Sequence, residues 1–246
     1  MKRLVLFLMV FTFFVAMGGV ASAVPTIDGD FQYSEWAGHF TEEDWVGQHG
    51  YVGPGYGGQE FDVEYLGLYI AGDMVYFGLQ TGFNLKDGVD NGLHNYEQGD
   101  FFMDFGGDGT WDVGIDYSVS GNEATYSLYL NPSYEDPYLY HNSTPYQVNK
   151  DNSSGPFGTF SGKYGTYKDR QGQHYVLEGA FSLWDFSGLS EYLGEKATIH
   201  WTMSCGNDVL EHTTSPVPTP EPATMLLFGT GLIGLAGLGR KKLKKR

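Results

Sequence analysis

The chain has 246 residues, 16% of them aromatic, and a formal net charge of −16 at neutral pH. Eight of its 14 basic residues lie at the two ends, so residues 24–219 carry 6 basic and 29 acidic residues, a net charge near −23. This charge excludes binding to nucleic acid or to anionic membrane surfaces, because both need a positive field. It suits solubility in a matrix, divalent cations or neutral sugars, and the length suits one domain with a sizeable core.

The N-terminus has the pattern of a secretory signal peptide. Lys2 and Arg3 precede an apolar run over residues 4–20, and Ala21-Ser22-Ala23 has the small-x-small form of a signal-peptidase site. We expect residues 1–23 to be removed by signal peptidase. A retained N-terminal anchor is the alternative.

The body, residues 24–212, has the pattern of an all-β fold. Apolar runs at 61–71 and 74–80 are joined by Gly72-Asp73, a composition typical of a type II′ hairpin. Alternating runs at residues 123–130, 174–183 and 196–204 predict further strands, and no long segment keeps a 3.6-residue apolar period. We therefore predict a single antiparallel β-sandwich, with jelly-roll and immunoglobulin-like topologies both open.

Residues 99–118 predict a hairpin whose loop is 106–110. Alternation places Phe101, Met103 and Phe105 on the core face of the first strand, and it places the odd-numbered residues from Trp111 to Tyr117 on the core face of the second. Phe105 opposite Trp111 is the register that matches these faces. A slip of one residue would move every side chain to the other face.

This register brings carboxylates together on the opposite face. Asp104 faces Asp112, and Asp100 faces Asp116, although like charges directly opposite each other destabilise a sheet. Calcium would relieve the repulsion, with Asp104, Asp108 and Asp112 as its ligands around the loop. The EF-hand spacing is absent, and a solvated acidic face that protects a sheet edge is the alternative.

The polar stretch over residues 131–172 is long for a connection in a compact domain, so it is functional, disordered or hides short strands. It contains tyrosines that could stack on sugar rings or pin the stretch to the domain: Tyr134, Tyr138, Tyr140 and Tyr146.

Cys205 is the chain's single cysteine, so no internal disulfide supports a protein expected to cross an oxidising compartment. Cys205 continues the apolar alternation of residues 197–203, which predicts a buried small side chain rather than a reactive thiol.

The sequence contains few signatures of catalysis. There is no nucleophile elbow, no H-E-x-x-H pair, no phosphate-binding loop and no dinucleotide fingerprint, and the seven histidines lack metal-ligand spacing. Two carboxylates of a glycosidase could still hide among the acidic residues, because their separation in space is invisible in a sequence.

The C-terminus begins with a Pro- and Thr-rich spacer at residues 213–219, followed by Pro220, Glu221 and Pro222. The apolar stretch 223–239 predicts a transmembrane helix of about 26 Å, slightly short of a hydrocarbon core of about 30 Å. Six basic residues in the tail 240–246 would stay cytoplasmic.

This order of motif, apolar span and basic tail resembles the PEP-CTERM sorting signal. The resemblance implies a Gram-negative, exopolysaccharide-producing bacterium, transient anchoring in its inner membrane, cleavage near the motif by exosortase, and then a cell-surface or extracellular location. Tails of this kind are also labelled as the C-terminal domain of ice-binding proteins, but this label does not indicate ice binding. An ordinary membrane anchor is the alternative.

The body resembles family-nine-like carbohydrate-binding and DOMON-type β-sandwiches in TIDGDFQYSEW (26–36), AGDMVYFGLQT (71–81), GDFFMDFGGDG (99–109) and HYVLEGAFSLWDF (174–186). HWTMSCGND (200–208) resembles a segment of uncharacterised exosortase-dependent surface proteins. No paired sugar-stacking tryptophans and no haem ligands can be assigned. We expect at least three core residues among the five tryptophans: Trp36, Trp45, Trp111, Trp184 and Trp201.

The sequence thus favours a non-catalytic surface or matrix protein associated with exopolysaccharide and biofilm. A dedicated carbohydrate-binding module is the first alternative, and a glycoside-active enzyme is the second. The expected partners are signal peptidase, exosortase and exopolysaccharide, and calcium is the one cofactor that the sequence suggests.

Overall fold

The computed structural model describes residues 24–216. The signal peptide predicted at 1–23 and the sorting signal predicted at 220–246, with its membrane helix, lie outside the described residues. Within residues 24–216, no helix is long and apolar enough to cross a membrane.

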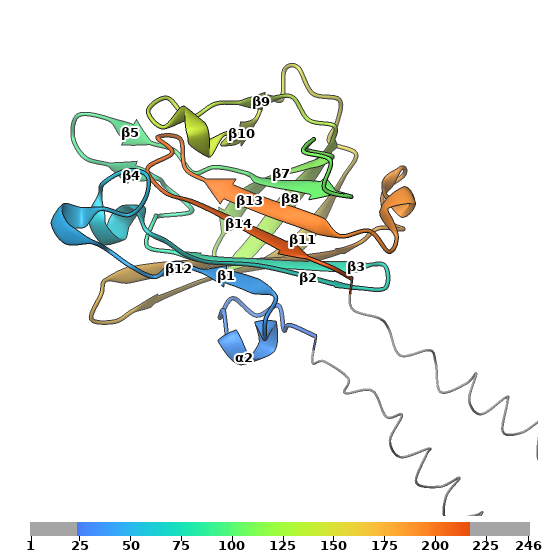
Figure 1. Ribbon diagram of the computed structural model, residues 1–246, viewed down its shortest axis with the longest axis horizontal. Helices are drawn as coiled ribbons and strands as arrows, with labels where there is room; N and C mark the ends of the chain where they lie inside the picture. Colours follow the sequence, from blue (N-terminus) through green and yellow to red (C-terminus); the bar gives the residue numbers. More distant parts are fainter. Residues whose placement is uncertain (1–23, 217–246) are drawn as a thin grey trace, which may run out of the picture. The chain divides into compact units, whose positions relative to one another are not determined.

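Ten strands form one antiparallel sheet in the order β1-β2-β3-β12-β11-β8-β7-β6-β13-β14 (Figure 1). Their bounds are β1 Phe40–Glu42, β2 Val63–Ala71, β3 Met74–Thr81, β6 Phe101–Phe105, β7 Val113–Ser120, β8 Glu123–Leu130, β11 Gly158–Lys168, β12 Gln173–Ser182, β13 Ala197–Thr202 and β14 Val209–Thr214. β14 therefore extends two residues into the segment predicted as spacer.

Short elements connect these strands. Two small hairpins pair β4 (Val89–Asp90) with β5 (Asn95–Tyr96) and β9 (Tyr134–Glu135) with β10 (Gln147–Val148). The described α-helix is α2 (Tyr33–Trp36), and 3₁₀ helices cover Gln48–Gly50, Gly58–Phe61, His141–Ser143 and Leu189–Tyr192.

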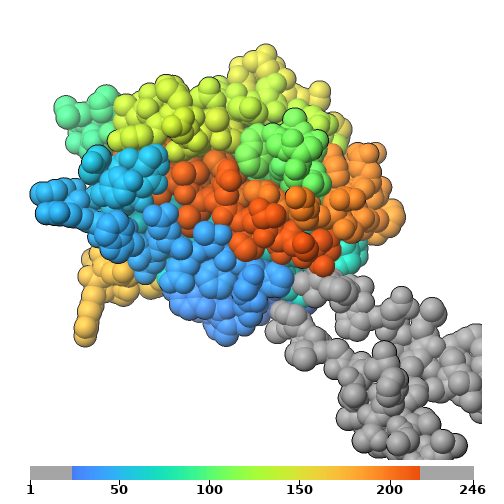
Figure 2. All heavy atoms as spheres, in the orientation of Figure 1, coloured from blue at the N-terminus to red at the C-terminus, as the bar shows by residue number. Residues whose placement is uncertain are grey.

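The sheet curls until its two edge strands meet, which gives a nearly closed, barrel-like domain. His39 Nδ1 lies 2.9 Å from Thr214 Oγ1, and the Thr41 hydroxyl donates a hydrogen bond of 2.8 Å to the Glu211 carbonyl. In Figure 2 the first described residues (blue) accordingly lie against the last strand (red). We call this contact of β1 and the preceding His39 with β14 the seam.

The all-β, antiparallel prediction is confirmed, but the two-sheet sandwich is replaced by one continuous sheet. Both arrangements bury one face of each strand, so the alternation of apolar residues is the same in either. Residue alternation alone therefore does not distinguish them.

The inner face of the sheet holds the main core. Its fully buried side chains include Leu66, Leu68, Ile70, Phe77, Leu79, Phe83, Phe101 and Trp201. Tyr126 packs parallel to Phe160, with ring centroids 5.0 Å apart. Burial of this much apolar area is the main stabilising contribution to the domain.

Part of the outer face is covered as well. The N-terminal segment with α2 packs Phe31 and Trp36 on Tyr65, Tyr69 and Val176, so the outer face of β2 and β12 carries a second, smaller core. A third cluster contains Phe102, Tyr129 and Val148. These covers create half-enclosed positions for polar side chains outside the barrel.

The predicted strands are found close to their expected positions. β2 and β3 flank Gly72, whose φ of 64° is the left-handed value that a type II′ turn requires of its first central residue. In the β6–β7 hairpin, Phe101 pairs with Ile115 and Met103 with Val113, which is the predicted register. Trp111 is the exception: it precedes β7 and packs against Phe102 on the outer face.

Candidate functional site

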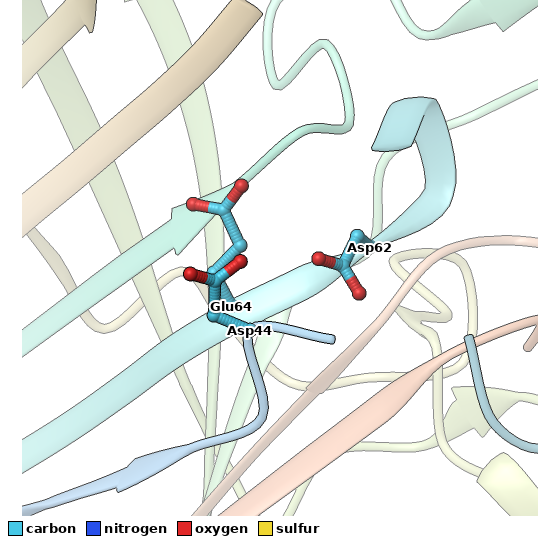
Figure 3. A group of neighbouring side chains, drawn as sticks. All are labelled: Asp44, Asp62 and Glu64. Atoms are coloured by element: carbon cyan, nitrogen blue, oxygen red, sulfur yellow. The ribbon is translucent and has the colours of Figure 1, made fainter. Parts of the chain in front are cut away.

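Three carboxylates gather outside the barrel at the beginning of β2 (Figure 3). Asp62 and Glu64 are two residues apart in extended backbone, so they point to the same side, while Asp44 follows β1. The β2–β3 register shifts between Val63 and Tyr65, a bulge that places both Glu64 and Tyr65 outside. We call Asp44, Asp62 and Glu64 the carboxylate cluster.

Glu64 is fully buried and held by three side chains. Gln80 Nε2 donates to its Oε2 at 2.6 Å, and Gln59 Nε2 and His174 Nδ1 both lie within hydrogen-bonding distance of its Oε1. His174 Nε2 is 2.8 Å from Asp169 Oδ1, so the ring is bound on both nitrogens. Both nitrogens can face carboxylates as donors when the imidazole is protonated.

The pKa values of these groups reflect burial and charge. Burial alone would lower the pKa of His174, but the hydrogen bond to Asp169 and the charge of Glu64 raise it overall. Burial, with the neighbouring Glu64 next, raises the pKa of Asp62 to about 7. Nearby, burial raises the pKa of Asp208 to about 8, although its carboxylate accepts the Val63 N–H at 2.6 Å.

Asp44 is held at the other side of the cluster. Gln171 Nε2 donates to its Oδ1 at 3.1 Å, and the Tyr65 hydroxyl lies 3.4 Å from its Oδ2. Sequence reasoning missed all three carboxylates. The available signal was Asp62 and Glu64 on either side of Val63 at the start of an apolar strand, whereas Asp44 is distant in sequence.

A polar pocket of about 490 Å³ adjoins the carboxylate cluster. Gln59 and Gln171 take part in both: each donates to a cluster carboxylate and each lines the pocket. The other lining residues are Glu60, Gly82, Asn84, Gly88, Val89, Asp90, Lys168, Gly172, Gln173 and Tyr175. We call it the amide pocket, because four side-chain amides surround it.

The aspartates predicted as calcium ligands do lie around the 106–110 loop, but each already accepts hydrogen bonds. Asp104 accepts the N–H groups of Gly107 and Gly109 at 3.0 and 2.9 Å. Asp112 accepts the Phe105 N–H at 2.7 Å and the Tyr192 hydroxyl at 2.9 Å, and Asp108 accepts from Thr110. The loop thus satisfies these carboxylates itself, and calcium at this position stays a prediction.

The second carboxylate pair expected from the sequence, Asp100 and Asp116, has a lysine beside it. Lys150 Nζ lies 2.8 Å from Asp116 Oδ1, and Asp100 Oδ2 accepts the Val148 N–H at 2.8 Å. Asp100 is buried, and burial together with the charge of Asp116 raises its pKa well above the usual value.

The four tyrosines of the 131–172 stretch do not form one platform. Tyr134 packs edge-on against Phe102, and Tyr138 stacks on Tyr96, with 45% and 44% of their surfaces exposed. Tyr140 and Tyr146 are half-buried. The stretch is not one loop either, because it holds β9, β10 and all of β11. Sugar stacking by these rings stays a prediction.

Cys205 is fully buried, as predicted, and burial raises the pKa of its thiol to about 11. Of the tryptophans, Trp36 and Trp201 are fully buried and Trp111 is half-buried. Trp45 and Trp184 are 60% and 65% exposed, so neither is the core residue that the sequence allowed.

The comparison with protein families identifies the end of the chain. Residues 218–241 match the family model described as the PEP-CTERM protein-sorting motif. This motif implies an exported protein that exosortase processes and sorts to the cell surface. No curated protein and no solved structure matches the chain.

Proposed function

We propose that the protein is a non-catalytic cell-surface or extracellular-matrix protein that associates with exopolysaccharide after release by exosortase. The observation that carries this proposal is the sorting motif at residues 218–241 behind an acidic β-domain. A body with a net charge near −23 stays soluble among hydrated polymers and is repelled by anionic membrane surfaces.

A strain without exosortase tests this function. The protein should then accumulate in the membrane fraction and disappear from the extracellular polysaccharide fraction, while a matched exported protein without the motif keeps its location. Unchanged extracellular location in that strain would contradict the proposal.

The amide pocket favours a second candidate, a carbohydrate-binding module. Its volume of about 490 Å³ is within the range of small-ligand sites, about 300–1,000 Å³. Side-chain amides both donate and accept hydrogen bonds, as sugar hydroxyls do, and Tyr175 adds an aromatic ring to the lining. Because the body is acidic, we propose a neutral rather than an anionic polysaccharide.

Polysaccharide pull-down with substituted chains tests this candidate. Gln173→Ala and Tyr175→Ala should reduce retention on the binding polysaccharide, whereas Tyr134→Ala and Tyr138→Ala should not. The reverse result would indicate that sugar binds to the tyrosines of the 131–172 stretch instead of the amide pocket. A glycoside-active enzyme is the least favoured proposal: Glu60 and Asp90 are carboxylates in the pocket lining, but the sequence carries no catalytic motif that assigns them as acid and base.

A further inference from the structure

We propose that the carboxylate cluster binds a hard divalent cation of the calcium type. The site differs from the 106–110 loop, and it does not depend on carbohydrate binding. Its ligands are oxygens of Asp44, Asp62 and Glu64, which come from the segment after β1 and from the beginning of β2.

Asp62 is the residue that points to a ligand. Its side chain is 0% exposed, and neither of its carboxylate oxygens has a hydrogen-bond partner in the described structure. A buried polar group without a partner costs free energy, and a buried charge costs much more unless it is paired or coordinates a metal. A cation in the cluster would coordinate this carboxylate and balance its charge.

The spacing of the oxygens fits such an ion. One ligand atom from each of the three residues lies within 4.8 Å of the others. Calcium binds oxygens at about 2.3–2.6 Å, so two ligands on opposite sides of the ion are about 4.8 Å apart. One ion can therefore reach all three carboxylates, and water would complete its coordination.

The surrounding charges leave room for a cation. No lysine or arginine of residues 24–216 forms an ion pair with the cluster. His174 is the cationic partner, but Glu64 and Asp169 occupy both of its nitrogens. Of the three cluster carboxylates, the one that contacts a cationic side chain within residues 24–216 is Glu64, and it shares that imidazole with Asp169.

Neighbouring side chains hold the ligands in place. Gln80 fixes one oxygen of Glu64, and Gln171 fixes one oxygen of Asp44. Outer-sphere hydrogen bonds of this kind orient metal ligands. The all-carboxylate donor set selects hard cations such as calcium over zinc or copper, which prefer nitrogen and sulfur.

Isothermal titration of the full-length chain in detergent with calcium, at constant ionic strength, tests the site. We expect saturable binding of one ion. Asp62→Asn and Asp44→Asn should each weaken the affinity about tenfold or more, because each removes a charged ligand. Asp185→Asn removes one exposed charge elsewhere and should leave the affinity unchanged.

Asp44 is only half-buried, so Asp44→Asn keeps the test valid if Asp62→Asn does not fold. Absence of saturable calcium binding, or equal affinity in the parent and in folded Asp44→Asn, would overturn the proposal. Loss of calcium binding in Asp108→Asn, but not in the cluster variants, would also overturn the proposal, because it would show that the ion binds at the 106–110 loop. Tighter binding of magnesium than of calcium would contradict the calcium type.

Discussion

The indole of Trp36 lies directly against Gly67 in the middle of β2: a Cβ built on Gly67 would be 2.6 Å from Cε3 of the indole. Gly78, the cross-strand partner of Gly67 on β3, leaves the same space, since its Cβ would be 2.7 Å from Cζ2. The paired glycines thus form a slot in the outer face of the sheet. The slot fixes α2 and the whole N-terminal segment on the barrel.

Gly67→Ala should therefore destabilise the domain by about 1–3 kcal/mol, the usual cost of overpacking. Thermal unfolding followed by circular dichroism measures this. In a Trp36→Ala background the same substitution should cost much less, because the clash is removed. Equal costs in both backgrounds would show that Trp36 does not depend on this slot.

Asp104→Ala should also destabilise the domain, because it leaves the N–H groups of the 106–110 loop without their acceptor. A loss of about 1–3 kcal/mol is expected from the unpaired donors. Asp104→Asn keeps one acceptor oxygen and should cost less. Denaturant unfolding gives both values, and an equal effect of the two variants would contradict the role of the carboxylate as an acceptor.

Glu178 makes the stability depend on pH. Burial chiefly raises its pKa to about 7, and Asp28 adds to the effect, although the Asp28 and Gly29 N–H groups donate to it. The folded state holds the proton more tightly than the unfolded chain, where the pKa is 4.5. The free energy of unfolding should therefore fall as the pH rises from about 4.5 to about 7, by an amount on the order of 3 kcal/mol.

Glu178→Gln removes this contribution. The melting temperature of the parent minus that of the variant should fall steadily as the pH rises from about 4.5 to about 7, and should stay constant at higher pH. Measuring the difference cancels the other carboxylates, whose titration both proteins share. A difference that is constant over this whole range would show that Glu178 does not titrate there.

Cys205 should be inert in the folded protein. It is fully buried and burial raises its pKa to about 11, so almost no thiolate is present near neutral pH. Iodoacetamide should leave the native protein unmodified and label it completely in concentrated guanidinium, as mass spectrometry would report. Rapid labelling of the native protein would contradict the burial.

Processing at both ends gives the last prediction. Extracellular protein should lack residues 1–23 and the segment after Pro220-Glu221-Pro222. We expect signal peptidase to cleave after Ala21-Ser22-Ala23, and the sorting motif implies processing by exosortase. Intact-mass measurement of the secreted material is sufficient. A secreted protein that still ends in Lys-Lys-Arg would exclude exosortase cleavage.

Strands with large alternating side chains could be predicted from the sequence, including β8, whose bounds match the expected run. β11 could not, because its glycines conceal the alternation. Gly162 and Gly165 occur where another backbone lies close: their Cβ atoms would be 2.1 Å from the Glu178 carbonyl oxygen and 1.9 Å from the Gly29 carbonyl oxygen. A composition that resembles a loop thus reflects close packing.

The carboxylate cluster was beyond the sequence for a different reason. Asp62 and Glu64 lie on the same face because the segment between them is extended, which residue alternation can indicate. Asp44 lies beside them because β1 pairs with β2. His174 comes from β12, which reaches β2 only across β3. Such long-range pairing depends on the whole sheet order, and no local pattern encodes it.

The seam has a consequence for the timing of export. A chain that crosses the membrane from its N-terminus delivers β1 early and β14 last, and the sheet edges cannot meet until Thr214 has emerged. Five residues then separate Thr214 from Pro220. The last strand therefore emerges only five residues ahead of the sorting motif, so the barrel can close only around the time when the motif reaches the membrane.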